Sequence, residues 1–460
     1  MTRPFPSAIG CLLWDDREDV MTRSVRFLVI GASVVWLGSV FIAAEQYAAK
    51  PVADVPTFAK DVAPILYKNC TGCHRPGEIA PMSLLTYEDA RPWAKSIRDE
   101  VNDGTMPPWH AAAPKGTFHN ERVLTAEEKE TLTKWANGGA PKGDPKEMPA
   151  VPTYAEGWML GKPDAVFEMV EPYKLPADGT IEYEYFYIPT NFTEPKWVKS
   201  IEIRPGNREV VHHVLVYYRA TPDMQRTPVM RPNAELSRMP PQKPVGVSLN
   251  PAKIRELPPR RLVATYAPGT SFQVAPEGTA FRLEPGGIIE LQMHYTTKGE
   301  AATDSTKVGL IYAKEPPPKE LRPAQFINGS FTLPAGADNV EVKAEAEFMQ
   351  DATVWGLFPH THLRGKKWEY KMLLPDGTEK SILSVPNYDF NWQTYYMFKE
   401  PLQVPKGAKI ISYAWYDNSA KNKSNPDPKM DVKWGDQTWE EMQYTGVLFT
   451  PSQAPTPIVK

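Results

Sequence analysis

Apolar and polar positions follow two different periods along this chain, and the change comes near residue 150. In residues 51–145 the apolar positions recur at helical spacing. They do so over 59–67, 87–102 and 125–137. The last of these stretches opens with a capping box, Thr125 followed three residues later by Glu128, and Gly138 follows its end. We therefore predict a small all-α domain over residues 51–145.

Beyond residue 155 the pattern becomes the two-residue alternation of β-strands, rich in β-branched and aromatic residues. The segments that carry it are 181–189, 197–205, 210–218, 288–297, 307–313, 369–377 and 442–449. A proline-rich linker at 146–155 precedes them, and a second proline cluster at 315–323 divides the region into halves. We predict two tandem antiparallel β-sandwiches of jelly-roll type, over 156–318 and 319–460.

The amino terminus has the pattern of a leader. Residues 27–44 are uncharged and largely apolar, and Arg23 and Arg26 precede them. Such a run is typical of a signal peptide or an N-terminal membrane anchor, and its length leaves cleavage and retention open. We interpret residues 1–50 as this leader, with Met21 as an alternative start. Either outcome places the rest of the chain outside the cytoplasmic membrane, in the periplasm.

Charge and cysteine content narrow the class of protein. The 52 Lys and Arg residues nearly balance the 55 Asp and Glu residues, which argues against a nucleic-acid partner. Of the three cysteines, Cys11 lies in the predicted leader, and Cys70 and Cys73 share one motif. An exported chain with this content has no disulfide to stabilise it, so we expect stability to come from core burial and bound metals.

The motif is Cys70-Thr71-Gly72-Cys73-His74, the attachment sequence of c-type haem. Two thiols add to the haem vinyl groups, and the histidine supplies an axial ligand to the iron. The competing interpretation, a redox-active dithiol, requires a thioredoxin-like βαβ context that the helical pattern here does not provide. We predict one covalent haem c, bound by Cys70, Cys73 and His74, and hence a cytochrome c domain over residues 51–145.

The second axial ligand of the iron is predicted to be Met106. It lies in Gly-Thr-Met-Pro-Pro-Trp, where the prolines stiffen the loop and a thioether raises the haem potential. Met82 is the main alternative, and His110 and His119 are further candidates. For the two histidines, the simpler interpretation is a partly exposed loop residue.

The five remaining histidines lie in three places within the strand-rich region: His212 and His213, His294, and His360 and His362. Residues i and i+2 of a strand share a face, so the last two can bind one metal. Adjacent residues face opposite ways, so the first two can share a metal only at a bulge or a strand end. His294, which ends a predicted strand, could supply a third nitrogen. The set predicts one three-histidine site and one two-histidine site that needs another ligand.

At this point the sequence resembles the copper type II, ascorbate-dependent monooxygenases, which include peptidylglycine α-hydroxylating and dopamine β-monooxygenase. The resemblance covers roughly residues 160–455, and its matching stretches are VVHHVLVYY, LQMHYTT, FPHTHLRGKKW and WGDQTWEEMQY. It implies an electron-transfer copper on His212, His213 and His294. It also implies an oxygen-binding copper on His360, His362 and Met442. Imidazoles with a soft thioether favour Cu(I), the state that reacts with dioxygen.

The chain departs from this family at identifiable places. Where the peptide-amidating enzyme has an arginine two positions before the His-x-His pair, this chain has Phe358, and where that enzyme has a tyrosine four positions after the copper methionine, it has Gly446. Eukaryotic members are rich in disulfides, and this chain is not. A peptidylglycine substrate is therefore not expected. The family's usual reductant is ascorbate, whereas this chain carries a predicted cytochrome of its own.

These features predict a periplasmic haem and copper monooxygenase that hydroxylates a C–H bond of a small organic substrate with O2. Electrons would pass from an external reductant, ascorbate or a redox protein, to the haem, then to the three-histidine copper and on to the copper of His360, His362 and Met442. The fused haem would act as a tethered donor at high effective concentration. A non-catalytic electron-transfer or copper-binding cytochrome is the alternative. A haem protein with purely structural histidines is a further one.

Overall fold

The computed structural model describes residues 55–78, 80–154, 157–220, 229–238, 257–267 and 270–452. All of them belong to one compact unit of the chain, Asp54–Lys460. The predicted leader lies outside the described residues. No described helix has the length and apolar character needed to cross a membrane.

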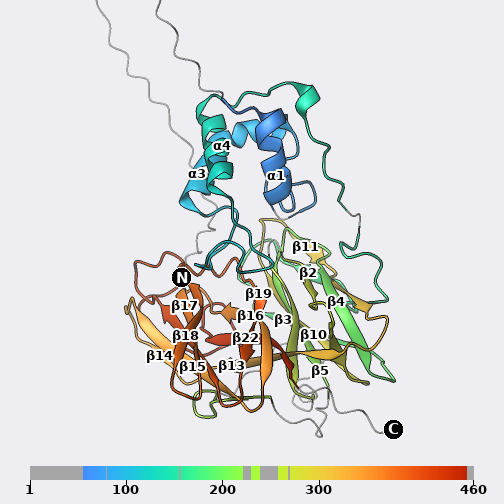
Figure 1. The fold of residues 1–460 in the computed structure, drawn as a ribbon, viewed down its shortest axis with the longest axis vertical. Coiled ribbons are helices and arrows are strands. Elements are labelled where there is room, and N and C mark those ends of the chain that lie inside the picture. The colour runs from blue at the N-terminus through green and yellow to red at the C-terminus, as the bar shows by residue number, and fades with distance from the viewer. Residues whose placement is uncertain are drawn as a thin grey trace, which may run out of the picture. The chain divides into compact units, whose positions relative to one another are not determined.

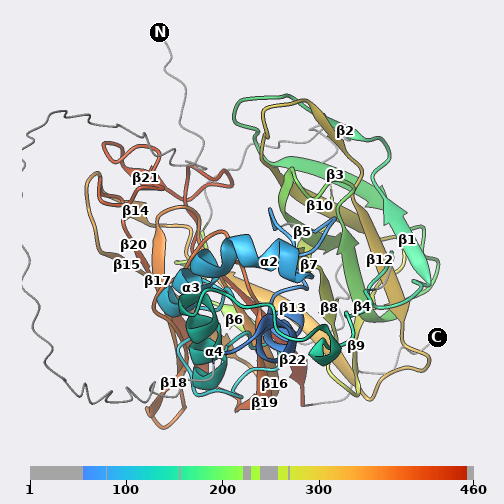
Figure 2. The same cartoon turned by 90° about the horizontal axis from the view of Figure 1, so that it is seen from above.

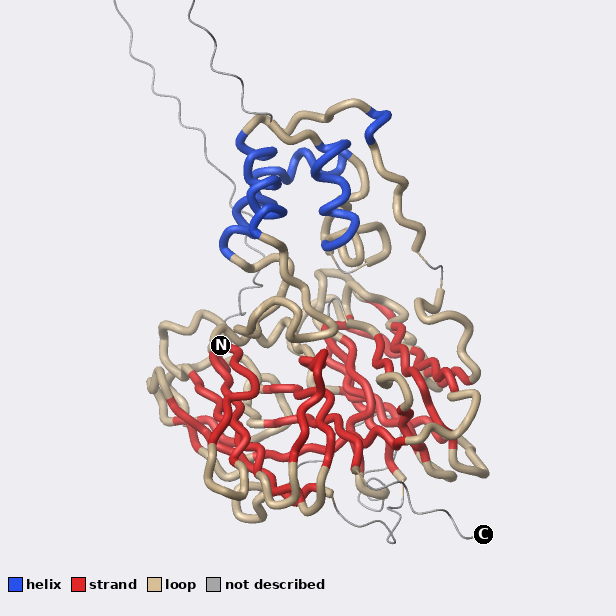
Figure 3. The backbone as a smooth tube through the Cα atoms, in the orientation of Figure 1, coloured by secondary structure: helices blue, strands red, loops and turns tan. Residues whose placement is uncertain are grey.

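All described helices lie in the first part of the chain, which we call the helical segment (residues 55–148; Figure 3). They are η1 (Phe58–Val62), α1 (Ala63–Asn69), α2 (Tyr87–Ala90), η2 (Arg91–Trp93), α3 (Ala94–Asp103), α4 (Ala126–Asn137) and η3 (Pro145–Glu147). Their apolar faces meet in one core, where Phe58 and Trp135 are fully buried. The three predicted helical stretches are confirmed, although the first two are each divided into shorter helices.

The ends of α4 follow the local sequence closely. Thr125 Oγ1 accepts a hydrogen bond from the Glu128 N–H at 3.0 Å, and Glu128 Oε2 accepts one from the Thr125 N–H at 2.7 Å. This reciprocal pair satisfies two N–H groups that the helix leaves without partners. Gly138 caps the other end, where a Cβ atom would lie 2.2 Å from Cγ1 of Val55. The predicted capping box is confirmed, and glycine at 138 allows close packing.

The rest of the described chain is built from strands (Figure 1). They are β1 (Ala165–Glu168), β2 (Tyr173–Leu175), β3 (Glu184–Pro189), β4 (Lys196–Arg204), β5 (Val211–Arg219), β6 (Met230–Pro232), β7 (Arg260–Tyr266), β8 (Phe272–Val274), β9 (Thr279–Leu283), β10 (Ile288–Tyr295), β11 (Ala302–Asp304), β12 (Lys307–Tyr312), β13 (Lys319–Ile327), β14 (Thr332–Leu333), β15 (Val340–Phe348), β16 (Ala352–His360), β17 (Gly365–Leu373), β18 (Glu379–Val385), β19 (Tyr396–Val404), β20 (Lys409–Tyr416), β21 (Val432–Lys433) and β22 (Tyr444–Pro451). The mostly-β class predicted for this region is confirmed.

Three large sheets contain most of these strands. The first is 9-stranded, with the order β1-β12-β4-β9-β13-β22-β16-β19 and β8 paired to β4. The second has the order β3-β10-β5-β7, and the third has the order β18-β17-β20-β15-β6. Among the described strand pairs, only β13 with β9 is parallel. Because β13 also pairs with β22, the 9-stranded sheet continues from one half of the strand-rich region into the other.

Two apolar cores lie between these sheets. The first takes buried residues from β3, β5, β7 and β10 and from β4, β9 and β12. The second takes them from β15, β17, β18 and β20 and from β13, β16, β19 and β22. In Figure 2 the strands of the two cores lie in different parts of the molecule. The five histidines of the strand-rich region lie on β5 and β10, at the end of β16 and in the loop that follows it, so both cores contribute to their placement.

Candidate metal centre

His212 and His213 are brought to one side of β5 by an irregularity in its pairing with β10. His213 lies opposite His294, yet Val211 lies opposite Tyr295, so His212 is an extra residue in the ladder. A bulge of this kind redirects a side chain that regular alternation would send to the other face. The bulge that the sequence required for a shared metal is therefore present.

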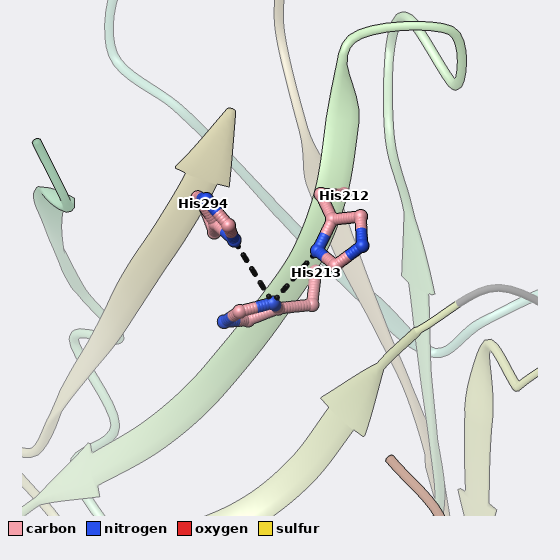
Figure 4. A group of neighbouring side chains, drawn as sticks. All are labelled: His212, His213 and His294. Atoms are coloured by element: carbon pink, nitrogen blue, oxygen red, sulfur yellow. Dashed lines mark hydrogen bonds between the residues drawn. The ribbon is translucent and has the colours of Figure 1, made fainter. Parts of the chain in front are cut away.

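Three imidazole nitrogens converge at this bulge (Figure 4). The Nδ1 atom of His213 lies 3.2 Å from Nδ1 of His212 and 3.3 Å from Nδ1 of His294. Two nitrogen ligands held about 2.0 Å from one tetrahedral ion lie about 3.3 Å apart. The three side chains therefore fit a metal bound through Nδ1 atoms.

The outer nitrogens of two of these rings face polar partners. His212 Nε2 lies 3.2 Å from Asn391 Oδ1, and His294 Nε2 lies 3.5 Å from Thr438 Oγ1. An amide oxygen only accepts, so the proton of His212 is on Nε2 and the Nδ1 lone pair is available to a metal. Burial lowers the pKa of all three histidines, and those of His213 and His294 lie well below the usual range. The rings are thus neutral at neutral pH.

His360 and His362 form the second group. The sequence placed both on one strand face, but β16 ends at His360, and His362 lies in the following loop. Their ring centroids are nevertheless 5.2 Å apart, and the two side chains are 3% and 0% exposed. The pairing is as predicted, and the loop after β16, rather than strand alternation, produces it.

Both rings of this second group use Nδ1 for a hydrogen bond. His360 Nδ1 lies 2.7 Å from Gln393 Oε1, and His362 Nδ1 lies 3.2 Å from the carbonyl oxygen of Glu440. Since both partners accept, each Nδ1 carries the proton and each Nε2 is left with a lone pair. Nε2 of His362 is buried without a partner among the described residues. Burial lowers the pKa of His360 to about 4 and that of His362 well below the usual range, which keeps both rings neutral.

Glu441 holds Met442 beside this pair. Glu441 is fully buried, and its Oε2 accepts hydrogen bonds from the N–H groups of His362 at 2.8 Å and Met442 at 3.1 Å. Its Oε1 accepts one from the N–H of Arg364 at 2.7 Å. One carboxylate therefore joins the loop that carries His362 to the segment that carries Met442, which is 8% exposed. The predicted third ligand is in the same region as the two histidines.

Two aromatic rings lie between the two groups of histidines. The Tyr183 ring centroid is 5.0 Å from that of His294 and 6.3 Å from that of His362. The Phe390 centroid is 6.0 Å from that of His294 and 5.9 Å from that of His362. Tyr183 and Phe390 thus each contact a ring of the first group and a ring of the second group.

One loop, which we call the bridging loop (residues 386–395), contacts both groups. Asn391 faces His212 in the first group, and Gln393 faces His360 in the second. The helical segment borders the end of this loop, because the Asn120 side chain donates to the carbonyl oxygen of Tyr395 at 2.6 Å. The bridging loop can therefore orient rings of both groups at the same time.

The Cys70–His74 stretch forms one tight turn after α1. The N–H groups of Cys73 and His74 donate to the carbonyl oxygen of Cys70 at 3.0 and 2.9 Å. Cys70 and Cys73 are free and partly buried, and burial lowers the pKa of His74, so its imidazole is neutral. Nδ1 of His74 is buried without a partner among the described residues. Two free thiols and a neutral imidazole on one turn suit the covalent attachment of haem c.

The candidates for the other axial position lie apart in the helical segment. Met82 packs against the same apolar core as Cys70. Met106 follows the end of α3, and its N–H donates to the carbonyl oxygen of Glu100 at 3.2 Å. The N–H of His119 donates to the carbonyl oxygen of Met397 at 2.8 Å, so its backbone is tied to β19. Met106 stays the prediction for this position.

Several residues around the histidines were not identified from the sequence. They are Tyr183, Phe390, Asn391, Gln393, Thr438 and Glu441. Glu441 and Thr438 had a signal, because both lie in the WGDQTWEEMQY stretch that carried the resemblance. The other four lie outside the stretches that carried it, and no spacing rule connects them to the histidines.

No family model and no curated protein matches the chain. Among solved structures, the VP2 subviral particle of infectious bursal disease virus is 9% identical over 63% of this chain and 72% of that chain, with a TM-score of 0.18. The major capsid protein P2 of bacteriophage PM2 is 8% identical over 64% of this chain and 99% of that chain, with a TM-score of 0.24. TM-scores this low carry no argument about this chain.

Proposed function

We propose that the chain is an exported haem and copper monooxygenase that hydroxylates a C–H bond of a small organic substrate with O2. In this proposal residues 51–145 are a cytochrome c domain, and residues 156–318 and 319–460 are the two β-sandwiches of a copper type II monooxygenase. The observation that carries it is the presence, in one compact unit, of two separate groups of buried or partly buried neutral histidines and a Cys-x-x-Cys-His turn. When bound, the haem and one copper would supply electrons, and the other copper would activate O2.

The donor atoms support copper at both sites. His212, His213 and His294 offer three imidazole nitrogens, which suit a copper that changes oxidation state. His360 and His362 offer two Nε2 atoms. Met442 is the candidate thioether, a soft ligand that favours Cu(I).

The surrounding protein would keep each ligand in its metal-binding form. The side-chain oxygens of Asn391 and Gln393 accept hydrogen bonds from His212 Nε2 and His360 Nδ1, which fixes the other nitrogen of each ring as the one with a free lone pair. Burial opposes protonation of the histidines, so protons do not compete with the metal near neutral pH. Phe390 packs against rings of both groups, so an apolar side chain lies between them.

The residues at two family positions favour a substrate other than a peptidylglycine. A Cβ atom on Gly446 would lie 2.8 Å from Oη of Tyr395 and 3.0 Å from Cβ of Phe358. Tyr395 thus already fills the space that a larger side chain at 446 would need. Phe358 itself is fully buried and stacks on Tyr395, with ring centroids 4.8 Å apart. Neither position presents a charged group to a substrate carboxylate.

The test is the ratio of copper to haem in the full-length protein, matured with haem and dialysed against limiting copper. We expect two coppers per haem, and about one in a His360→Ala/His362→Ala variant. A His212→Ala/His213→Ala variant serves as the matched control and should lose the other copper. Oxygen uptake is then screened against organic substrates. Haem with no retained copper would refute the proposal, and two coppers without substrate-dependent oxygen use would favour the electron-transfer alternative.

A further inference from the structure

Glu78 joins the haem-attachment loop to the strand that carries the first histidine group. It lies four residues after His74, and its Oε1 is 2.7 Å from Nη2 of Arg75. Its Oε2 forms an ion pair with Nη1 of Arg208, which lies four residues before His212. The side chains of Arg75, Glu78 and Arg208 are only 14%, 13% and 17% exposed. A largely buried carboxylate between two guanidinium groups is a specific contact, because losing one partner leaves the others desolvated and uncompensated.

A second contact also joins the helical segment to the strand-rich region. Nη2 of Arg122 donates to Oγ1 of Thr270 at 3.0 Å, just beyond the end of β7. The ion pair of Glu78 and this hydrogen bond thus join the helical segment to the residues just before β5 and just after β7.

A short route leads from this point to the first histidine group. Tyr266, the last residue of β7, is 3% exposed and lies opposite Val214 of β5. Val214 is the neighbour of His213 in the chain. Tyr266, Val214 and His213 thus form a continuous path through one strand pair, without an intervening loop.

We propose that Glu78 is a positioning residue that holds the haem-attachment loop against the start of β5, so that the haem delivers electrons to the three-histidine site through Tyr266, Val214 and His213. This inference rests on the proposed function. One electron moves in each transfer, so a ferrous haem becomes ferric while Cu(II) at the three-histidine site becomes Cu(I). An external reductant, ascorbate or a redox protein, then returns the haem to the ferrous state.

The test compares Glu78→Gln with a matched control in the copper-loaded, full-length protein. The control is Glu88→Gln, because Glu88 pairs with Lys142 on the surface of the same helical segment, 2.6 Å apart. The haem is reduced by a photoexcited flavin, with a sacrificial electron donor that does not chelate copper, and its reoxidation by Cu(II) is followed in its absorption spectrum. Hydrogen exchange of residues 206–214 is measured on the same samples, together with the haem spectrum and the copper content.

We expect Glu78→Gln to slow reoxidation of the haem roughly tenfold or more, because a tethered donor that leaves its docked position loses its favourable geometry. Backbone protection of 206–214 should fall, while haem spectrum and copper content stay as in the unmodified protein. Glu88→Gln should change none of these. Unchanged protection in Glu78→Gln overturns the positioning role, and lost protection with an unchanged rate overturns the route. A protein without copper would refute the proposed function instead, and the hydrogen exchange result alone then decides the role of Glu78.

Discussion

Replacing Glu441 should disturb one metal site and leave the other intact. Its carboxylate accepts hydrogen bonds from the N–H groups of His362, Arg364 and Met442 inside a fully buried environment. Glu441→Ala leaves three buried donors without their partner, and each costs about 1–3 kcal/mol, so a total of roughly 3 kcal/mol or more is expected. Glu441→Gln keeps one acceptor oxygen but turns an NH2 group toward an N–H donor, which costs about 1–3 kcal/mol.

The variant to measure is therefore Glu441→Gln, which should stay folded. We expect its free energy of unfolding in urea to fall by about 1–3 kcal/mol, the cost of one lost buried hydrogen bond. Its copper content should fall from two to about one per haem, because the loop that carries His362 and Arg364 loses one of its two hydrogen bonds to the side chain at 441. The absorption spectrum of the haem should not change.

Glu202 provides the matched control. It is 4% exposed, and its two carboxylate oxygens accept hydrogen bonds from the N–H groups of Met159 and Leu160 at 2.8 and 2.9 Å. Glu202→Gln therefore removes a similar buried bond without touching either histidine group. It should lower stability and leave both coppers in place. Two tightly bound coppers in Glu441→Gln, or loss of the same copper from Glu202→Gln, would refute the reasoning.

Three further predictions concern pH, the first histidine group and the helical segment. In the copper-free protein His360 should contribute a loss of stability of about 2 kcal/mol as pH falls from 7 to 5, because the folded ring, with a pKa of about 4, stays neutral while the unfolded ring gains a proton near 6.5. Glu441 acts in the opposite direction, since burial raises the pKa of its carboxyl group to about 7. The contribution of His360 is therefore measured as a difference, and urea unfolding of His360→Gln should show a shallower fall in stability with acid than the unmodified protein. Asn391→Ala should weaken copper binding by His212, His213 and His294 roughly 10- to 100-fold, as measured by competition with a chelator. Asn391→Asp keeps an acceptor oxygen and should retain most of the affinity. Equal affinity in the two variants would contradict the role of Asn391 in orienting His212. Thr125→Ala should destabilise the helical segment by about 1 kcal/mol through loss of the cap, seen as a lower Tm, and Thr125→Ser should restore it.

The sequence by itself determined the elements and the ligand types. Helical periodicity and the capping box of Thr125 and Glu128 located α4, and alternation located seven of the strands, among them β5 and β10, because these patterns depend on neighbours within a few residues. Long strands such as β13, β15, β16 and β19 were not predicted. The Cys-x-x-Cys-His motif and the five clustered histidines likewise indicated the candidate haem and metal ligands, because each is a short pattern in the sequence. For His212 and His213 to share a metal, the sequence required either a bulge or a strand end, since regular alternation would have separated them, and the structure has the bulge.

Only the tertiary structure shows which of these residues lie together and which other residues contact them. The bulge opposite His294 depends on the register of β5 with β10. That register brings together residues such as His213 and His294, which lie 81 positions apart in the sequence. Asn391, Gln393 and Glu441 reach the histidines from loops 179, 33 and 79 positions away along the chain, so no local pattern could reveal them. The ion pair of Glu78 with Arg208 spans 130 positions. Such contacts form because burial of two shared cores brings distant strands and loops together, and that packing cannot be obtained from periodicity alone.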